Sequence, residues 1–329
     1  MARRTRSQQE KPSPDKGLAP ENYLDLNATF YGMRPHIYLR RRLRSLWLWH
    51  GDPPGLAALL NEKFIVEDIA VTVGTEGDDE AEKAERERFV VIEAEVLLHH
   101  VSETLLRLYL VHAQKSSCPW LDVSREKNFG RLKKDVEKLR KRLKAGEEKP
   151  GIEAAFFPPG DRKKMIPDHG DEVWEEAAQN LSEYLEYYAS HFLDSAPYNA
   201  AKHGLALLAG ESRLELTAGD DPVPFLKRSG SALVYLEVER DEGSGDPRWA
   251  KVTKWIVLRR ALVMIHIGCR LVEEIWKIGA GHRTPNKPDD LRLFVEPKCA
   301  EILRRTEQEA EGGIPGVTTD RISERLLYR

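Results

Sequence analysis

Residues 86–113 read RERFVVIEAEVLLHHVSETLLRLYLVHA, and this stretch decides the fold that we predict. Aliphatic residues occur on nearly all sides of a helix drawn through it. Such a helix is buried, because none of its faces suits water. The charged residues directly before Arg86 run on without Gly or Pro, so we expect the helix to begin inside that charged run. The sequence thus predicts one long, enclosed helix.

A polar ridge runs along this otherwise apolar helix. Glu95, His99, Glu103 and Arg107 follow one another at four-residue spacing, and therefore share one face. Buried charges need partners. We expect Glu103 to pair with Arg107 and His99 to bond to a second helix. The other interpretation is a metal site, but di-iron bundles use Glu-x-x-His pairs, and the ridge has none.

Other segments complete a bundle and add a sheet. Apolar residues recur at helical spacing over 36–49, 129–144, 171–193, 257–277 and, more briefly, 297–310. A further helix is expected from 195 to 210, and the Pro and Gly content predicts a long connection over 145–170. Period-two patterns at 213–216, 232–238 and 250–255 predict strands. The predicted fold class is mainly α, a central helical bundle with a small antiparallel β-meander insertion.

The chain divides into six parts on this basis. They are a disordered N-terminal arm at 1–20, an N-terminal helical segment at 21–80, the helical bundle core at 81–212, the β-meander at 213–256, a helix packing on the bundle at 257–280, and a charged, loosely ordered C-terminal tail at 281–329. The arm contains charged residues, Pro and Gln but almost nothing to bury, which is typical of disorder.

The composition excludes several classes of protein. With 51 basic and 54 acidic residues the net charge is −3, so the chain is no globally basic nucleic-acid binder, although local basic faces are allowed. Three widely spaced cysteines form no CxxC pair, which favours a reducing cytoplasm. No apolar run suits a membrane span, and GxGxxG, Walker A, GxSxG and HExxH motifs are absent. We expect no metal, cofactor, nucleotide or membrane partner.

The stretch Tyr198-Asn199-Ala200-Ala201-Lys202-His203-Gly204 places reactive groups on one turn of helix. Asn199 and His203 lie four residues apart, and Tyr198 pairs likewise with Lys202. The imidazole can move protons near neutral pH, the amide can orient it, and the ammonium can meet a phosphate. The alternative is structural, with Asn199 linking helices, His203 satisfied in the core and Lys202 in solvent.

This stretch resembles the motif of the HEPN superfamily, helical-bundle proteins that include many RNases of bacterial defence and toxin systems. The family has an arginine, then a polar residue, and a histidine a few positions later. Asn199 and His203 match the last two, whereas Tyr198 stands at the arginine position. The resemblance implies an RNA-binding or metal-independent RNA-cleaving protein, and a homodimer.

The catalytic roles that the resemblance implies extend to the ridge. His203 would be the acid or base and Asn199 its orienter, while Arg107 or Lys202 would face the phosphate. Glu103 would lie in the same pocket, with His99, if the ridge faces this turn. The alternative function is a non-catalytic helical interaction or scaffold protein, in which the same polar groups hold helices together.

Two basic helices suggest how RNA could bind. Arg40, Arg41 and Arg44 lie in one of them, near Trp47 and Trp49, and Lys134, Lys138 and Arg142 lie in the other. Cations can follow a phosphate backbone and tryptophans can stack on bases. The other interpretation is a pair of solvated faces whose tryptophans turn inward.

Overall fold

The structure is a computed structural model that describes residues 18–51, 63–66, 69–72, 80–125, 129–158, 160–165, 171–204, 206–216, 226–240, 246–285, 297–308 and 321–325. Most of the arm expected over 1–20 lies outside these residues.

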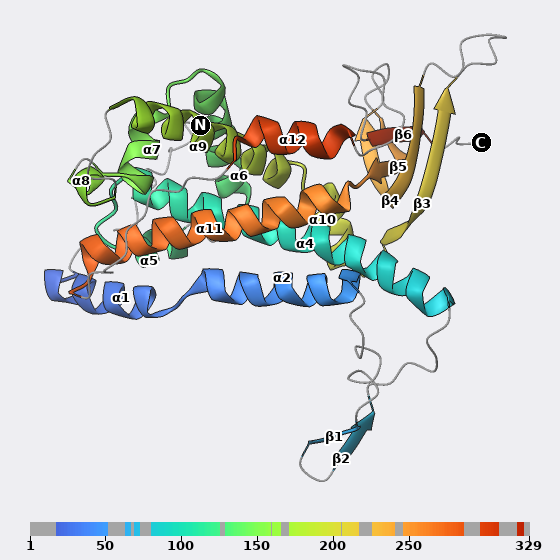
Figure 1. Ribbon diagram of the computed structural model, residues 1–329, viewed down its shortest axis with the longest axis horizontal. Helices are drawn as coiled ribbons and strands as arrows, with labels where there is room; N and C mark the ends of the chain where they lie inside the picture. The colour runs from blue at the N-terminus through green and yellow to red at the C-terminus, as the bar shows by residue number, and fades with distance from the viewer. Residues whose placement is uncertain are drawn as a thin grey trace, which may run out of the picture.

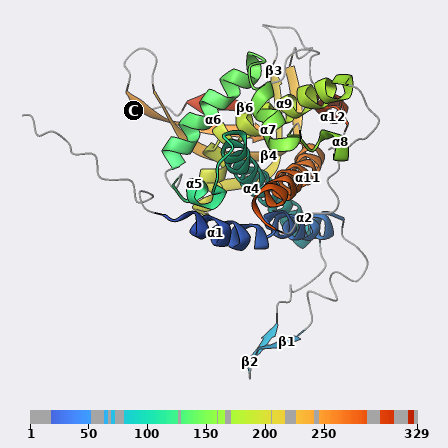
Figure 2. The same ribbon diagram turned by 90° about the vertical axis from the view of Figure 1, so that its left-hand side faces the viewer.

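The bundle is built around α4 (Glu80–Ala113), which runs along the length of the molecule (Figure 1). It packs against α2 (Pro35–Gly51), α9 (Asp171–Leu193) and α11 (Leu258–Arg283). Viewed along the bundle, α4 and α11 lie side by side with α2 beside them (Figure 2). Val101, Leu105 and Tyr109 of α4 are fully buried, so the prediction of one enclosed helix is confirmed.

Shorter helices close the bundle around this core. They are α1 (Pro20–Gly32), α5 (Pro119–Arg125), α6 (Phe129–Lys144), α7 (Lys149–Phe156), α8 (Arg162–Met165), α10 (Ala196–Lys202) and α12 (Cys299–Gln308). The narrow apolar seam of α6 is buried as its spacing predicts, through Leu132, Val136, Leu139 and Leu143. Mainly α architecture is therefore confirmed.

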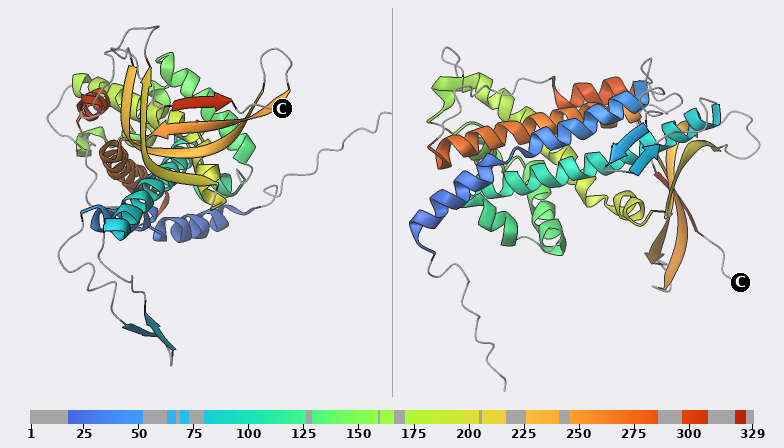
Figure 3. Two further views of the ribbon diagram at one scale, coloured as in Figure 1. Left: turned by 90° about the vertical axis from the view of Figure 1, so that its right-hand side faces the viewer. Right: turned by 90° about the horizontal axis from the view of Figure 1, so that it is seen from below.

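A four-stranded antiparallel sheet covers one end of the bundle (Figure 3). Its strands, in spatial order, are β3 (Leu207–Leu216), β4 (Leu226–Arg240), β5 (Pro247–Trp255) and β6 (Arg321–Arg325). Leu233 and Val252 pack on Val91 of α4, so an apolar cluster joins the sheet to the bundle. A separate antiparallel hairpin pairs β1 (Lys63–Val66) with β2 (Ile69–Thr72).

Two boundaries differ from the sequence prediction. The helix expected from 195 to 210 stops at Lys202, because Gly204 adopts a left-handed φ of 67° that ends helices, and Leu207 already begins β3. The long connection expected over 145–170 contains two helices instead. Pro150 lies in the first turn of α7, where proline needs no amide hydrogen bond, so it starts that helix rather than preventing it.

The C-terminal part of the chain contributes to the core and the sheet. Cys299 and Ile302 of α12 are buried, and β6 pairs with the outer edge of β5. The expected helix near 297–310 is thus confirmed, whereas β6 lies in a segment that the sequence predicted as a charged, loosely ordered tail. The meander is correspondingly a strand wider than predicted.

Candidate functional site

The turn of α10 divides its side chains between the interior and solvent. Asn199, Lys202 and His203 are exposed, while the ring of Tyr198 is turned toward the bundle and half-buried. The amide of Asn199 donates to Ser195 Oγ over 3.5 Å. His203 is the C-cap residue, with its backbone N–H bonded to carbonyls of the preceding turn. The structural alternative of a core histidine at 203 is therefore wrong, because this imidazole faces solvent.

Tyr198 is the residue through which α10 meets the polar ridge of α4. Its ring stacks on His99, with centroids 4.0 Å apart and planes 10° from parallel. Its hydroxyl lies 3.0 Å from His100 Nε2, and Arg42 Nη1 lies 2.6 Å from His100 Nδ1. A guanidinium can only donate, so His100 Nδ1 accepts and the neutral ring donates from Nε2 to Tyr198. A directed chain of hydrogen bonds thus links α2, α4 and α10.

His99 of the ridge and the adjacent His100 are both held neutral. Burial, with the nearby Arg42 guanidinium, lowers the pKa of His100. Burial and His191 lower the pKa of His99 to about 3. The pKa of Tyr198 is raised, chiefly because its hydroxyl is partly desolvated. The place where the HEPN motif has arginine therefore holds a neutral tyrosine, and the nearest fixed cation in this chain of bonds is Arg42.

The remaining ridge residues occupy different surroundings. Arg107 Nη2 lies 2.8 Å from Glu103 Oε1, so the predicted pair is confirmed. Arg107 lies about two turns beyond His99, where it lines a cavity of about 450 Å³ with Trp120 and Trp276. The ridge thus contacts α10 through the imidazole of His99, which stacks on Tyr198, and not through His203. The expected bond of His99 to a second helix is replaced by this stacking.

Glu95, at the start of the ridge, belongs to a buried ion cluster that sequence reasoning missed. Lys254 Nζ of β5 lies 2.9 Å from both Glu95 Oε1 and Asp194 Oδ2. Burial opposes the charge on each carboxyl, but the ammonium more than offsets it and holds both pKa values below their ordinary range. His191 and Arg260 join these groups around a cavity of about 260 Å³. Lys254 lies far along the chain in a strand, so no local spacing reveals the cluster.

A second candidate site is the groove between α2 and α11. Its cavity has a volume of about 530 Å³, and the exposed indole of Trp47 forms part of the wall. Its charged lining consists of Arg40, Arg44, Arg270, Lys277, Glu273 and Glu274, with His266 beside them. The four cations exceed the two carboxylates, so the groove has a positive excess of two. Both Arg40 and Lys277 contact Glu273, over 2.5 and 3.1 Å.

The expected basic residues differ in how free their charges are. Arg41 and Arg44 are exposed on α2, and Trp47 is 46% exposed, whereas Trp49 packs against Phe89. On α6, Lys134 is exposed, but Lys138 contacts Asp135 over 2.9 Å. Arg142 contacts the buried Glu148 over 2.5 Å, which makes it a structural ion pair. The α2 face, with its groove, is the better placed of the two for an anionic polymer.

No family model, curated protein or solved structure matches this chain. Over the described ranges, none of the helices combines the length and apolarity that crossing a membrane requires. The same residues contain no group of three or more His, Cys, Asp or Glu side chains arranged to hold a metal ion. The three cysteines are buried and free.

Proposed function

We propose that this protein binds single-stranded RNA in the groove between α2 and α11, in the cytoplasm. The observation that carries the proposal is the placement of the exposed Trp47 indole among Arg40, Arg44, Arg270 and Lys277 in one groove. Bases stack on such a ring whatever their sequence, and cations follow the phosphates beside it. The near-neutral whole chain makes this local excess of positive charge the feature that would attract RNA.

Fluorescence anisotropy with a labelled single-stranded oligonucleotide tests the groove. We expect Trp47→Ala to weaken binding by about 5- to 150-fold, since stacking contributes about 1–3 kcal/mol per base. Arg44→Ala should lower the slope of log affinity against log salt by about 0.7, which corresponds to one phosphate contact on a single strand. Arg41→Ala, the same change at an exposed position of α2 outside the groove lining, is the matched control.

Three results would contradict RNA binding in this groove. Wild-type protein that leaves the oligonucleotide unbound at low salt excludes RNA binding. Binding that Trp47→Ala leaves unchanged excludes the groove, and a larger effect of Arg41→Ala than of Arg44→Ala moves the site to the outer face of α2.

We further propose that, if the protein cuts RNA, the exposed turn of α10 does so. Asn199, Lys202 and His203 all face solvent there, and the Lys202 ammonium lies 5.9 Å from the centre of the Tyr198 ring. His203 would be the acid or base, with Asn199 beside it. Lys202 would supply the cation, because Arg107 is paired with Glu103 further along α4. A homodimer, which the HEPN resemblance implies, would bring two such turns to one RNA.

Incubation with bulk RNA separates cutting from binding. His203→Ala is compared with His50→Ala, which removes an exposed histidine at the far end of α2. Cleavage by the wild type and His50→Ala but not by His203→Ala supports the catalytic role. Equal cleavage by all three assigns the activity to a contaminant or another site, and no cleavage at all leaves a binding protein. Light scattering of the same samples reports whether a dimer forms.

The Tyr198 network favours a second candidate, a non-catalytic interaction protein. The network joins three helices through His99, His100 and Arg42, as a structural polar motif would. On this interpretation Tyr198→Phe lowers the free energy of unfolding by about 1 kcal/mol through one lost hydrogen bond. His203→Ala should then change neither stability nor any RNA-dependent signal. Tyr38→Phe, at an exposed tyrosine, is the control.

A further inference from the structure

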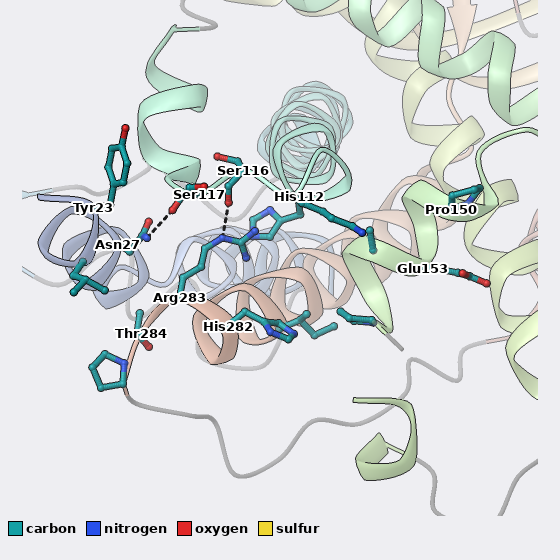
Figure 4. A pocket seen from close by; sticks show the side chains of 16 residues that line it. Tyr23, Asn27, His112, Ser116, Ser117, Pro150, Glu153, His282, Arg283 and Thr284 are labelled. Carbon is teal, nitrogen blue, oxygen red and sulfur yellow. Dashed lines mark hydrogen bonds between the residues drawn. The ribbon is translucent and has the colours of Figure 1, made fainter. Parts of the chain in front are cut away.

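A cavity with a volume of about 840 Å³ lies near the end of the bundle at which α11 finishes (Figure 4). The first half of α1, the ends of α4 and α11, the residues just after α4, and α7 supply its lining. Leu24, Ala154 and Ile278 make much of the wall apolar. Small-molecule sites are typically about 300–1,000 Å³, mostly apolar, with a few placed polar groups. The volume and lining fit that description.

The charged groups of the cavity favour an anion. Lys115 and Arg283 contribute positive charge, and Arg283 is held by a bond of 2.9 Å from Nε to the Ser116 carbonyl. The one carboxylate in the lining, Glu153, lies 2.9 Å from Arg162, and the positive charge of Arg162 offsets its negative charge. Lys115 adopts a left-handed φ of 54°, directly after the end of α4, where the chain turns at the cavity wall. The balance of fixed charge in the cavity is positive.

The side-chain oxygen of Asn27 adds a second requirement, a hydrogen-bond donor on the ligand. The Asn27 amide nitrogen donates to the Ser117 carbonyl over 2.9 Å, which fixes the orientation of the side chain because a carbonyl can only accept. Asn27 Oδ1 is buried and has no hydrogen-bond partner among the described residues. A buried acceptor without a partner destabilises the fold, and a ligand with an N–H or O–H donor would offset that cost.

The floor of the cavity is chemically inert. His112 Nδ1 lies 2.7 Å from the Leu108 carbonyl and therefore donates to it, while its Nε2 accepts from the Tyr31 hydroxyl over 2.8 Å. Burial, with the Arg283 charge, lowers the pKa of His112 to about 3. Both ring nitrogens are occupied and the ring stays neutral, so His112 offers no proton transfer. These contacts suit a binding site rather than a reaction site.

We propose that this cavity binds a small aromatic carboxylate that carries a hydrogen-bond donor on its ring system. The carboxylate meets Lys115 and Arg283, the donor meets Asn27 Oδ1, and the ring body fills the apolar wall lined by Ala154 and Ile278. This site is separate from the groove between α2 and α11, and the proposal does not depend on RNA binding.

Three related probes test each part of the ligand by isothermal titration calorimetry on the full chain. Indole-3-acetate has the ring, the donor and the charge; indole-3-ethanol lacks the charge; 1-methylindole-3-acetate lacks the donor. We expect indole-3-acetate to bind, and each of the other two to bind about tenfold more weakly or worse. Absence of binding by indole-3-acetate, or equal affinities for the three probes, overturns the proposal.

Variants locate the binding in this cavity. Ala154→Trp fills the apolar wall and should abolish binding of indole-3-acetate, whereas Ala206→Trp, at an exposed position, should not. Lys115→Gln should weaken it about tenfold, with Lys134→Gln on the exposed face of α6 as the control. Thermal unfolding of each variant checks that it is folded. Unchanged affinity in a folded Ala154→Trp variant would place the ligand elsewhere and refute this site.

Discussion

At the scale of single residues, His99 is the most constrained titratable group of the ridge. It is fully buried, stacked on Tyr198 and 5.3 Å from the ring of Phe192. Neither of its ring nitrogens has a hydrogen-bond partner among the described residues. The folded protein lowers the pKa of His99 to about 3 and so keeps it neutral, whereas an unfolded chain protonates it below its ordinary pKa of 6.5. His99 therefore does not affect the pH dependence of stability above about pH 6.5, and it destabilises the folded protein increasingly as the pH falls below that value.

His99→Phe should remove this pH dependence. Between the two pKa values the unfolded chain binds a proton that the folded chain does not, so each such histidine lowers stability by about 1.4 kcal/mol per pH unit. Denaturant unfolding at pH 7 and pH 5 should show a loss that is about 1–2 kcal/mol smaller in His99→Phe than in wild type. His50→Phe, at an exposed site, should behave as wild type. An identical loss in all three proteins contradicts the neutral, buried state of His99.

Lys254→Met should be among the more destabilising substitutions in the chain. Glu95 is almost fully buried, and removing its cation leaves an uncompensated charge, which costs about 3–5 kcal/mol. Adding Glu95→Gln should recover part of the loss. Lys251→Met is the control, because Lys251 lies on the same strand but is exposed and 3.9 Å from an exposed Glu324. A loss below 1 kcal/mol in chemical unfolding would show that water enters the cluster.

The sequence predicted those residue contacts that depend on local spacing. Glu103 and Arg107 are one turn apart, so their pairing followed from helix geometry alone. Lys254 and Arg42 reach α4 from distant segments, and nothing in their own neighbourhood distinguishes them from solvent-facing cations. The candidate site was thus predicted as a set of elements, while its internal bonds were not.

At the scale of elements, the approach of α4 to α11 depends on Gly268. A Cβ atom there would lie 2.3 Å from Val101 Cγ1 and 3.1 Å from the Tyr188 hydroxyl, both closer than ordinary van der Waals contact. Gly268→Ala should therefore force the helices apart and cost about 1–3 kcal/mol, although alanine favours helix. Gly32→Ala has no atom within 4 Å of the added carbon and is the control. Equal melting temperatures for the two variants would contradict this packing.

The first and last residues of α6 and α9 were predicted correctly, because in these helices the spacing of apolar residues and the residues at the boundaries indicate the same limits. The error at α10 arose where they conflict. Leu205 and Leu208 continue a helical spacing, but Gly204 ends the helix, and the sheet then recruits Leu207. Tertiary pairing outweighed local periodicity, which single-sequence patterns do not contain.

At the scale of the whole molecule, the last described segment of the chain, β6, adds the edge strand next to β5 in the four-stranded sheet. Arg321 of β6 pairs with Glu237 of β4 and lies 3.7 Å from Asp194, so β6 supports the same ion cluster as Lys254. The pairing of β6 with β5 could not be predicted from the sequence, since a five-residue strand in a charged tail carries little hydrophobic signal.

Truncation after residue 320 should loosen the sheet end of the molecule. Without β6 the outer edge of β5 loses its partner, so amide hydrogen exchange over 251–254 should accelerate while that of α4 changes little. Truncation after residue 325, which keeps β6, is the control. Unchanged exchange in β5 after the longer deletion would contradict the pairing.

The single helix α4 contributes to the sheet junction through Glu95, to α10 through His99, to α2 through His100 and to the cavity floor through His112. Each of these contacts needs its side chain at one angle around the same axis. One inserted or deleted residue between Glu95 and His112 would rotate one end against the other by about 100°. This segment therefore tolerates no change in length, which makes it a poor place for a tag, a linker or an inserted domain.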